Sequence, residues 1–243
     1  MSIPRFHVSI PLTVPGTLDL PESVAHHALR VLRLHSGDAV TLFNGKGGEY
    51  AARITATGKH DVTVAIERHD PVERESPLPV TLVQAVSSGD RMDLTIQKAV
   101  ELGVSRIVPV ESERCVVRLK GERAEKRAAH WRQVVISACE QCGRNRIPEV
   151  RMIAPLDVWL AAEADGAQRW MLLPGADTAL RDLPRSRKPV ELLVGPEGGL
   201  TDTEAEAARR AGYQPVRLGP RVLRTETAAP ALLAALQALW GDF

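Results

Sequence analysis

Two segments in the C-terminal half of the sequence combine glycines with charged and hydroxyl side chains in a way that could bind a small ligand. The first, Gly195-Pro196-Glu197-Gly198-Gly199, lies between the apolar run Val190–Val194 and the helix-capping sequence Thr201–Glu204. Its glycines let a ligand approach the backbone closely. A phosphate-binding loop would need G-x-x-x-x-G-K-[ST], which is absent, and the Glu197 carboxylate would repel phosphate. The segment therefore predicts a loop for a cationic or hydroxyl-bearing ligand, with a tight structural turn as the alternative.

The second segment, Arg224-Thr225-Glu226-Thr227, comes directly before the last expected helix. A helix start capped by Thr225 or Thr227 would explain the threonines and Glu226. It would not explain Arg224, because a positive charge is unfavourable at the positive end of a helix. A substrate carboxylate, phosphate or polarisable base would explain that arginine.

Alternating strands and helices must position these loops. We expect strands at Val80–Val86, Arg106–Val110, Trp170–Leu173, Val190–Val194 and Val216–Leu218, and helices at Asp90–Leu102, Glu122–Cys142, Thr201–Gly212 and up to about Trp240. This alternation predicts an α/β domain with a mainly parallel sheet. Ligands bind such sheets beyond the carboxyl ends of the strands, where the two segments and a third loop, Leu173-Pro174-Gly175, are expected.

The N-terminal part of the chain has a different pattern. Short β-rich stretches punctuated by Gly and Asn predict a small barrel-like β domain with one helix, about Glu22 to Leu34. The expected strands are Arg5–Ile10, Ala39–Asn44, Glu49–Thr57 and Asp61–Glu67. A segment rich in proline and charge follows, so we place the first domain at residues 1–72, a linker at 73–79 and the second domain at 80–243.

Composition excludes several classes of protein. The sequence contains no apolar run of about 18 residues, which a membrane span would need, and residues 1–10 do not resemble a secretory signal. We therefore expect a cytoplasmic protein. The pair Cys139-x-x-Cys142 lacks a second pair of ligands for zinc, so we expect no metal.

The net charge is only +1, but residues 106–146 carry ten Lys and Arg against five Glu. Such a segment is either a phosphate-binding surface or a solvated helix face.

The motifs Val194–Leu200 and Leu218–Ala228 closely resemble the two C-terminal motifs of the ribosomal RNA small subunit methyltransferase E family. Further similar segments follow in order along the chain: Arg5-Phe6, His27–Arg33, Lys98–Val104, Glu113–Cys115, and Glu140–Arg144 with Pro148. The resemblance covers essentially the whole length. It implies a PUA-like N-terminal β-barrel and a C-terminal α/β domain of the SPOUT class with a trefoil knot.

The resemblance also implies the activity, which is methylation of N3 of a uridine in 16S ribosomal RNA. It implies S-adenosylmethionine as the cofactor, and a homodimer to whose interface the last helix contributes. The cofactor-binding residues carried over from the family are Leu173, Pro174, Gly175, Gly195, Pro196, Glu197, Gly198, Gly199, Leu218, Gly219, Val222, Leu223, Arg224, Thr225, Glu226, Thr227 and Ala228.

Uridine N3 carries a proton, so its methylation needs a base or a group that stabilises the uridine anion. We assign Arg224 to the second role and Glu197 or Glu226 to the first. Because N3 lies on the pairing edge, the target must be unpaired or flipped out. The residues expected to contact RNA are Arg5, Arg30, Arg33, Arg118 and Arg144, with Arg30 and Arg33 on one face of the first helix.

Three alternatives stay open at this point. A SPOUT methyltransferase of this kind could act on transfer RNA or on another ribosomal position. A non-catalytic RNA-binding or ribosome-assembly protein could keep the same fold, although the intact Gly195, Gly198 and Gly199 argue against it. A nucleotide-hydrolysing enzyme is disfavoured because the lysine of a phosphate-binding loop is missing.

Overall fold

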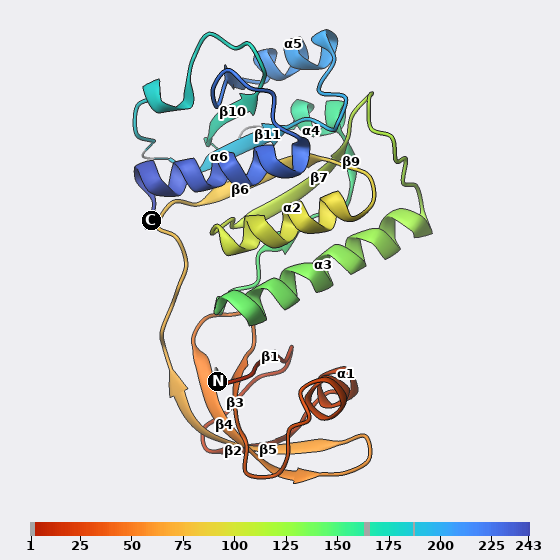
Figure 1. Ribbon diagram of the computed structural model, residues 1–243, viewed down its shortest axis with the longest axis vertical. Coiled ribbons are helices and arrows are strands. Elements are labelled where there is room, and N and C mark those ends of the chain that lie inside the picture. Colours follow the sequence, from red (N-terminus) through yellow and green to blue (C-terminus); the bar gives the residue numbers. More distant parts are fainter. Residues whose placement is uncertain (1–2, 163–165, 187) are drawn as a thin grey trace. The chain divides into compact units, whose positions relative to one another are not determined.

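A computed structural model describes residues 3–162, 166–186 and 188–243 of the chain (Figure 1). Its contacts divide the chain into two compact units, Met1–Glu75 with Cys139–Ile147, and Ser76–Ala138 with Pro148–Phe243. The sequence pattern gave no sign that residues 139–147 group with the first unit. The domain limits expected at residues 72 and 80 stay predictions.

The first unit contains a mixed five-stranded sheet. Its strands are β1 (Arg5–His7), β2 (Gly16–Asp19), β3 (Ala39–Phe43), β4 (Glu49–Thr57) and β5 (Val62–Asp70), in the order β1-β3-β4-β5-β2. Only the β1–β3 pair is parallel. Alternate residues of β3, β4 and β5, such as Leu42, Ile54 and Val64, are buried against Ala25 and Ala28. The predicted N-terminal β domain is therefore confirmed, whereas β2 was missed.

The helix of this unit is shorter than expected. It consists of α1 (Glu22–His26) and a π-helical turn at His27–Val31. Arg33 follows with a left-handed φ of 54°. The prediction that Arg30 and Arg33 share a helix face is therefore wrong, because the helix ends before Arg33.

The second unit contains a seven-stranded sheet in which every strand pair is parallel. Its order is β12-β10-β11-β6-β7-β8, and β9 pairs with β7. The strands are β6 (Val80–Ala85), β7 (Arg106–Glu111), β8 (Glu149–Val150), β9 (Ala154–Pro155), β10 (Gln168–Leu172), β11 (Val190–Val194) and β12 (Gln214–Val216). The predicted parallel α/β domain is confirmed. The strand expected at Val216–Leu218 begins and ends earlier, so Leu218 lies in a loop.

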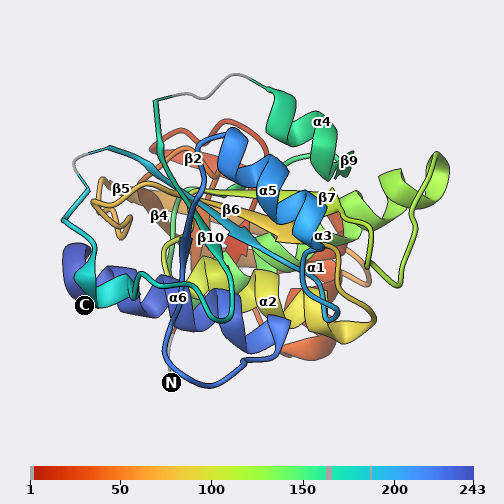
Figure 2. The same cartoon turned by 90° about the horizontal axis from the view of Figure 1, so that it is seen from above.

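Helices cover both faces of this sheet, so central strands such as β11 are buried along their whole length. The helices are α2 (Asp90–Glu101), α3 (Glu122–Cys142), α4 (Leu156–Ala161), α5 (Asp202–Arg210) and α6 (Thr225–Trp240), with a 3-10 turn at Leu180–Asp182. Figure 2 shows α2 and α6 side by side on one face and α4 with α5 on the other. Because all strands run in one direction, the loops after β10, β11 and β12 meet at one edge.

In the part of the chain that the structure describes, no helix has the length and apolar character needed to cross a membrane. The described His, Cys, Asp and Glu side chains form no group of three or more that could hold a metal ion.

Candidate active site

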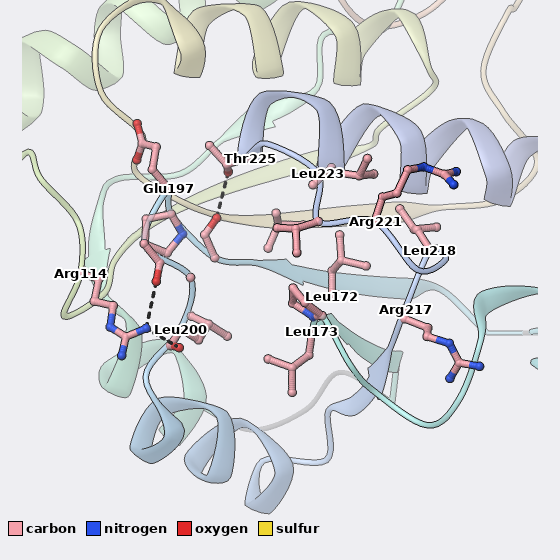
Figure 3. Close-up of a pocket in the computed structure, with 18 of the residues that line it drawn as sticks. Arg114, Leu172, Leu173, Glu197, Leu200, Arg217, Leu218, Arg221, Leu223 and Thr225 are labelled. Carbon is pink, nitrogen blue, oxygen red and sulfur yellow. Dashed lines mark hydrogen bonds between the residues drawn. The ribbon is translucent and has the colours of Figure 1, made fainter.

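The three loops at the carboxyl edge of the second sheet enclose a cavity of about 340 Å³ (Figure 3). Its walls are mostly apolar, with Leu172 at the end of β10 and Leu173 after it, Val194 at the end of β11, and Leu218 and Leu223 after β12. The full lining is Arg114, Leu172, Leu173, Pro174, Val194, Gly195, Pro196, Glu197, Gly198, Gly199, Leu200, Arg217, Leu218, Gly219, Arg221, Val222, Leu223, Thr225 and Ala228.

Most of the predicted cofactor residues line this one cavity. Gly175, Arg224, Glu226 and Thr227 are not among its lining, and Gly175 borders a neighbouring hollow instead. Sequence reasoning missed six lining residues, namely Arg114, Leu172, Val194, Leu200, Arg217 and Arg221. Leu172 and Val194 could have been found, because each is the last residue of a strand that leads into a predicted loop.

The glycines of the loop after β11 serve the loop's own conformation. Gly199 has a left-handed φ of 70°, which side chains disfavour. A Cβ on Gly195 would lie 3.0 Å from the Leu200 nitrogen, and one on Gly198 would lie 3.1 Å from the Arg114 Cβ. The sequence interpretation, that these glycines make room for a ligand, is therefore incomplete.

Two sets of hydrogen bonds fix this loop. Arg114 Nη1 donates to the Gly198 carbonyl at 2.9 Å, as Figure 3 shows. At the start of α5, Thr201 and Glu204 form the predicted capping box, in which the Thr201 hydroxyl accepts from the Glu204 N–H at 3.2 Å. Glu204 Oε2 in turn accepts from the Thr201 N–H at 2.9 Å, and Glu204 Oε1 accepts from the Glu113 N–H at 2.7 Å. The segment that carries Arg114 is therefore tied to the loop and to the helix that follows it.

Thr225 connects the loop after β11 to α6. Its buried hydroxyl donates to the Gly195 carbonyl at 2.9 Å and accepts from Gln84 Nε2 at 3.0 Å. Thr225 is the first residue of α6, and the N-cap is Arg224, which makes no capping hydrogen bond through its side chain. The alternative that Thr225 or Thr227 caps this helix is therefore wrong, since the Thr225 side chain is used between the loops.

Glu197 turns out of the loop toward the start of α2. Its Oε1 accepts from the Ser88 N–H at 2.9 Å, the Ser88 hydroxyl at 2.8 Å and Arg91 Nη1 at 3.0 Å. Partial burial on its own would raise the pKa of this carboxyl, but these hydrogen bonds outweigh it and lower the pKa to about 2. So acidic a group accepts a proton poorly, which argues against the general-base role predicted for Glu197.

The other predicted catalytic residues lie at the first turn of α6. The Glu226 carboxylate is mostly buried, and its Oε1 lies 3.7 Å from Arg91 Nε. Arg224 is exposed, as is Arg221 in the cavity wall. Within the described residues, neither of these two guanidinium groups has a hydrogen-bond or ion-pair partner. Their charge therefore remains available for a ligand.

Two of the predicted RNA-binding arginines are used inside the first unit. Arg5 donates to Glu49 Oε2 at 2.5 Å and to Asn145 Oδ1 at 2.6 Å. Arg144 is buried and donates to both oxygens of Glu75. The geometry argues against RNA contacts through these two side chains, because both guanidinium groups are already paired with carboxylates inside the unit.

The other three predicted RNA-binding arginines are exposed. Arg30 lies in the π-helical turn, Arg33 follows it, and Arg118 precedes α3. Arg118 Nη2 donates to the Glu113 carbonyl at 2.6 Å, which leaves its charge unneutralised. These three residues stay predicted RNA contacts.

Two sequence families match the chain. One is described as an RNA methyltransferase domain and matches residues 74–237, and the other is an RNA methyltransferase PUA domain that matches residues 20–67. Among curated proteins, the ribosomal RNA small subunit methyltransferase E of Buchnera aphidicola subsp. Schizaphis graminum is 35% identical over 240 residues, covering 99% of this chain and 98% of that protein. The protein of the same name from Bacillus subtilis is 27% identical, covering 90% and 89%.

Solved structures agree with these matches. The chain superimposes on a ribosomal RNA small subunit methyltransferase E from Neisseria gonorrhoeae bound to S-adenosyl methionine, with a TM-score of 0.93, 45% identity and full coverage of both chains. A putative methyltransferase from Legionella pneumophila in complex with the same cofactor gives a TM-score of 0.96 at 41% identity, again with full coverage of both chains.

Proposed function

The chain belongs to the ribosomal RNA small subunit methyltransferase E family, and we propose that it transfers a methyl group from S-adenosylmethionine to N3 of a uridine in 16S ribosomal RNA. The observation that carries this proposal is the cavity formed by the loops after β10, β11 and β12. It lies at the carboxyl edge of a parallel sheet, where α/β proteins bind ligands. A relative that is 45% identical over the full chain was solved with this cofactor bound.

The residues of the cavity fit this cofactor. A volume of about 340 Å³ is in the range of small-molecule sites. Apolar walls from Leu173, Leu218 and Leu223 suit a flat purine, and the carbonyls and N–H groups of the three loops can bind its polar edge. When bound, S-adenosylmethionine supplies an electrophilic methyl group on a sulfonium.

On the acceptor side, we assign to Arg224 the stabilisation of negative charge on the uracil oxygens as the N3 proton leaves. Its guanidinium is exposed at the start of α6, beside the cavity wall residues Leu223 and Thr225. A fixed positive charge stabilises a developing anion without rearrangement. The target base must leave any duplex to reach this position, because its pairing edge is what reacts.

The two acidic residues have different roles in this proposal. Glu197, whose pKa is about 2, orients the loop after β11 through Ser88 and Arg91 and takes no proton. Glu226 is retained as the candidate base. Replacement of Glu226 with Gln tests this role. A base acts only when it is unprotonated, so the rate of methyl transfer by the wild type should depend on pH, and the variant should lack that dependence.

We further propose that the enzyme is a cytoplasmic homodimer. A second cavity of about 610 Å³ borders the C-terminal half of α6, where Ala235, Ala238 and Leu239 face Leu180 and Pro220. Leu239 is 47% exposed in the single chain, and a second copy of the chain would cover it. Light scattering on purified protein tests this, and a monomer at micromolar concentration would contradict it.

Transfer of a labelled methyl group tests the proposed function. Small ribosomal subunits without the modification, free 16S ribosomal RNA and bulk transfer RNA are each incubated with enzyme and S-adenosylmethionine. Label is expected in 16S ribosomal RNA, from the subunit or the free RNA. Label in transfer RNA alone would support the alternative substrate, and cofactor binding without transfer to any RNA would contradict the proposal.

A further inference from the structure

The first half of α3 presents a row of basic side chains that the proposed reaction does not use. Arg123, Lys126, Arg127 and His130 are spaced i, i+3, i+4 and i+7, so they lie on one face of the helix. All four are exposed. The buried residues Ala128 and Trp131 lie on the adjoining face of the helix, where Trp131 Nε1 donates to Asp93 Oδ1 of α2 at 3.1 Å. We call these four residues the basic stripe.

The charge of Arg123, Lys126 and Arg127 is largely unneutralised, whereas His130 Nε2 lies 2.6 Å from Asp93 Oδ2. Among the residues that the structure describes, Arg123 and Arg127 have no hydrogen-bond or ion-pair partner. Lys126 lies 3.6 Å from Glu122, but both side chains are at least 80% exposed, and such pairs contribute little. Arg169 of the same unit, by contrast, is paired with the carboxylate of Glu191. The stripe therefore differs from an ordinary salt-bridged helix face.

The basic stripe is connected to the cavity by a short basic segment. Arg114 lines the cavity, and Arg118 and Lys120 follow it along the chain before α3 begins. Both are exposed. Figures 1 and 2 show that α2, α3 and α6 all begin at the edge of the parallel sheet where the loops of the cavity lie. Exposed positive charge therefore continues from the cavity wall onto α3.

We propose that the basic stripe, together with Arg118 and Lys120, binds the phosphate backbone of the RNA beside the target nucleotide. This inference rests on the proposed function, because it names the surface that holds the substrate. The net charge of the chain is only +1, so affinity for a polyanion must come from local concentrations of charge. Helix positions four residues apart are separated by about 6 Å along the axis, which lets neighbouring side chains reach separate phosphates of one strand.

The test replaces the three strongest charges of the stripe together, as Arg123→Gln, Lys126→Gln and Arg127→Gln. A matched control removes three exposed charges that line neither cavity, as Arg185→Gln, Lys188→Gln and Arg210→Gln. Binding of 16S ribosomal RNA transcript and of small subunits is measured from about 50 to about 300 mM salt. The slope of log affinity against log salt concentration is determined from these values. Melting temperature and affinity for S-adenosylmethionine are measured on the same samples.

The stripe variant is expected to bind RNA about tenfold more weakly, with a salt slope smaller by about 2, because each phosphate contact contributes about 0.7 to 0.9. The control and the cofactor affinity are expected to be unchanged. If the stripe variant melts early, the double variant Arg123→Lys, Arg127→Lys is compared with Arg123→Gln, Arg127→Gln, and only the latter should lose affinity.

Unchanged RNA affinity and salt slope in the stripe variant would overturn the inference. Loss of binding to subunits with unchanged binding to free RNA would also overturn it, because the stripe would then contact a ribosomal protein. Neither measurement needs methyl transfer. Wild-type protein that binds RNA through the stripe but transfers no methyl group would therefore contradict the proposed function and leave the stripe standing.

Discussion

The carboxylate of Glu197 and the guanidinium of Arg91 lie 3.0 Å apart and join the loop after β11 to the first turn of α2. The same guanidinium lies 3.7 Å from Glu226 at the start of α6. One arginine, which no sequence motif singled out, therefore connects both acidic residues that the sequence offered as bases. Together with the hydrogen bonds from Ser88, this contact lowers the pKa of Glu197.

The Glu197→Gln variant is expected to be less stable than wild type by about 1–2 kcal/mol at pH 7, after allowance for solvent screening. The pKa of Glu197 is lowered from 4.5 to about 2 in the folded protein. Its contribution is therefore complete above pH 4.5 and disappears as the pH falls toward 2. Urea unfolding at several pH values measures the difference, and a gap that does not narrow in acid would refute this account.

Thr225→Val should cost about 1–3 kcal/mol of stability, because it removes the hydroxyl from a buried hydrogen-bonded group. The Gly195 carbonyl loses its donor and Gln84 Nε2 loses one acceptor. Affinity for S-adenosylmethionine should fall as well, since Gly195 lines the cavity. Thr203→Val on the exposed side of α5 is the control. Calorimetry that finds equal cofactor affinity in both variants would contradict the linking role of Thr225.

Gly199→Ala should separate backbone strain from ligand binding when compared with Gly121→Ala. Both glycines have a left-handed φ, of 70° and 52°, and a Cβ at either position would meet no atom within 4 Å. Each variant is therefore expected to lose about 1–2 kcal/mol of stability from strain alone. Only Gly199→Ala should also weaken cofactor binding, because Gly121 lies outside the cavity lining. Equal cofactor affinities would show that the loop conformation does not matter for binding.

Arg224→Ala should lower kcat for methyl transfer by about 100-fold or more, as expected for loss of a group that stabilises a developing anion. The affinity for S-adenosylmethionine should change little, because Arg224 is not part of the cavity wall. Arg221→Ala, which removes a second exposed arginine that does line the cavity, is the comparison. A larger loss of kcat in Arg221→Ala than in Arg224→Ala would transfer the proposed role to Arg221.

Much of the fold could be predicted from the sequence, since periodicity and punctuation mark the elements. The apolar run Val190–Val194 and the capping box at Thr201 and Glu204 placed β11 and α5 within a residue or two. Short elements such as β8 and β9 were missed, because two residues carry no periodicity. The helix of the first unit was predicted too long, since Leu32 continues the apolar spacing of Ala25 and Leu29, whereas the π-helical turn ends at Val31 and Arg33 has a left-handed φ.

The site was predictable in its loops but not in its side-chain partners. Most residues of the three predicted loops line one cavity, whereas Arg224, Glu226 and Thr227 do not. Ser88 and Arg91 lie more than 100 positions before Glu197, so only the folded chain could show that they lower its pKa. The pairing of Arg5 could not be predicted either, because its carboxylate partner Glu49 is 44 positions away and no local pattern indicates that Arg5 is partly buried. The trefoil knot stays a prediction from the family resemblance.

The central claim is methylation at N3 of a uridine, and nucleoside analysis of the RNA product tests it most directly. Small subunits that lack the modification are incubated with enzyme and labelled S-adenosylmethionine, and the RNA is digested to nucleosides and separated by liquid chromatography with mass detection. The account predicts label in 3-methyluridine, formed about 100-fold more slowly by the Arg224→Ala variant. Label in a methylated cytidine or purine, or in a uridine methylated at C5 or the 2′-hydroxyl, would contradict it.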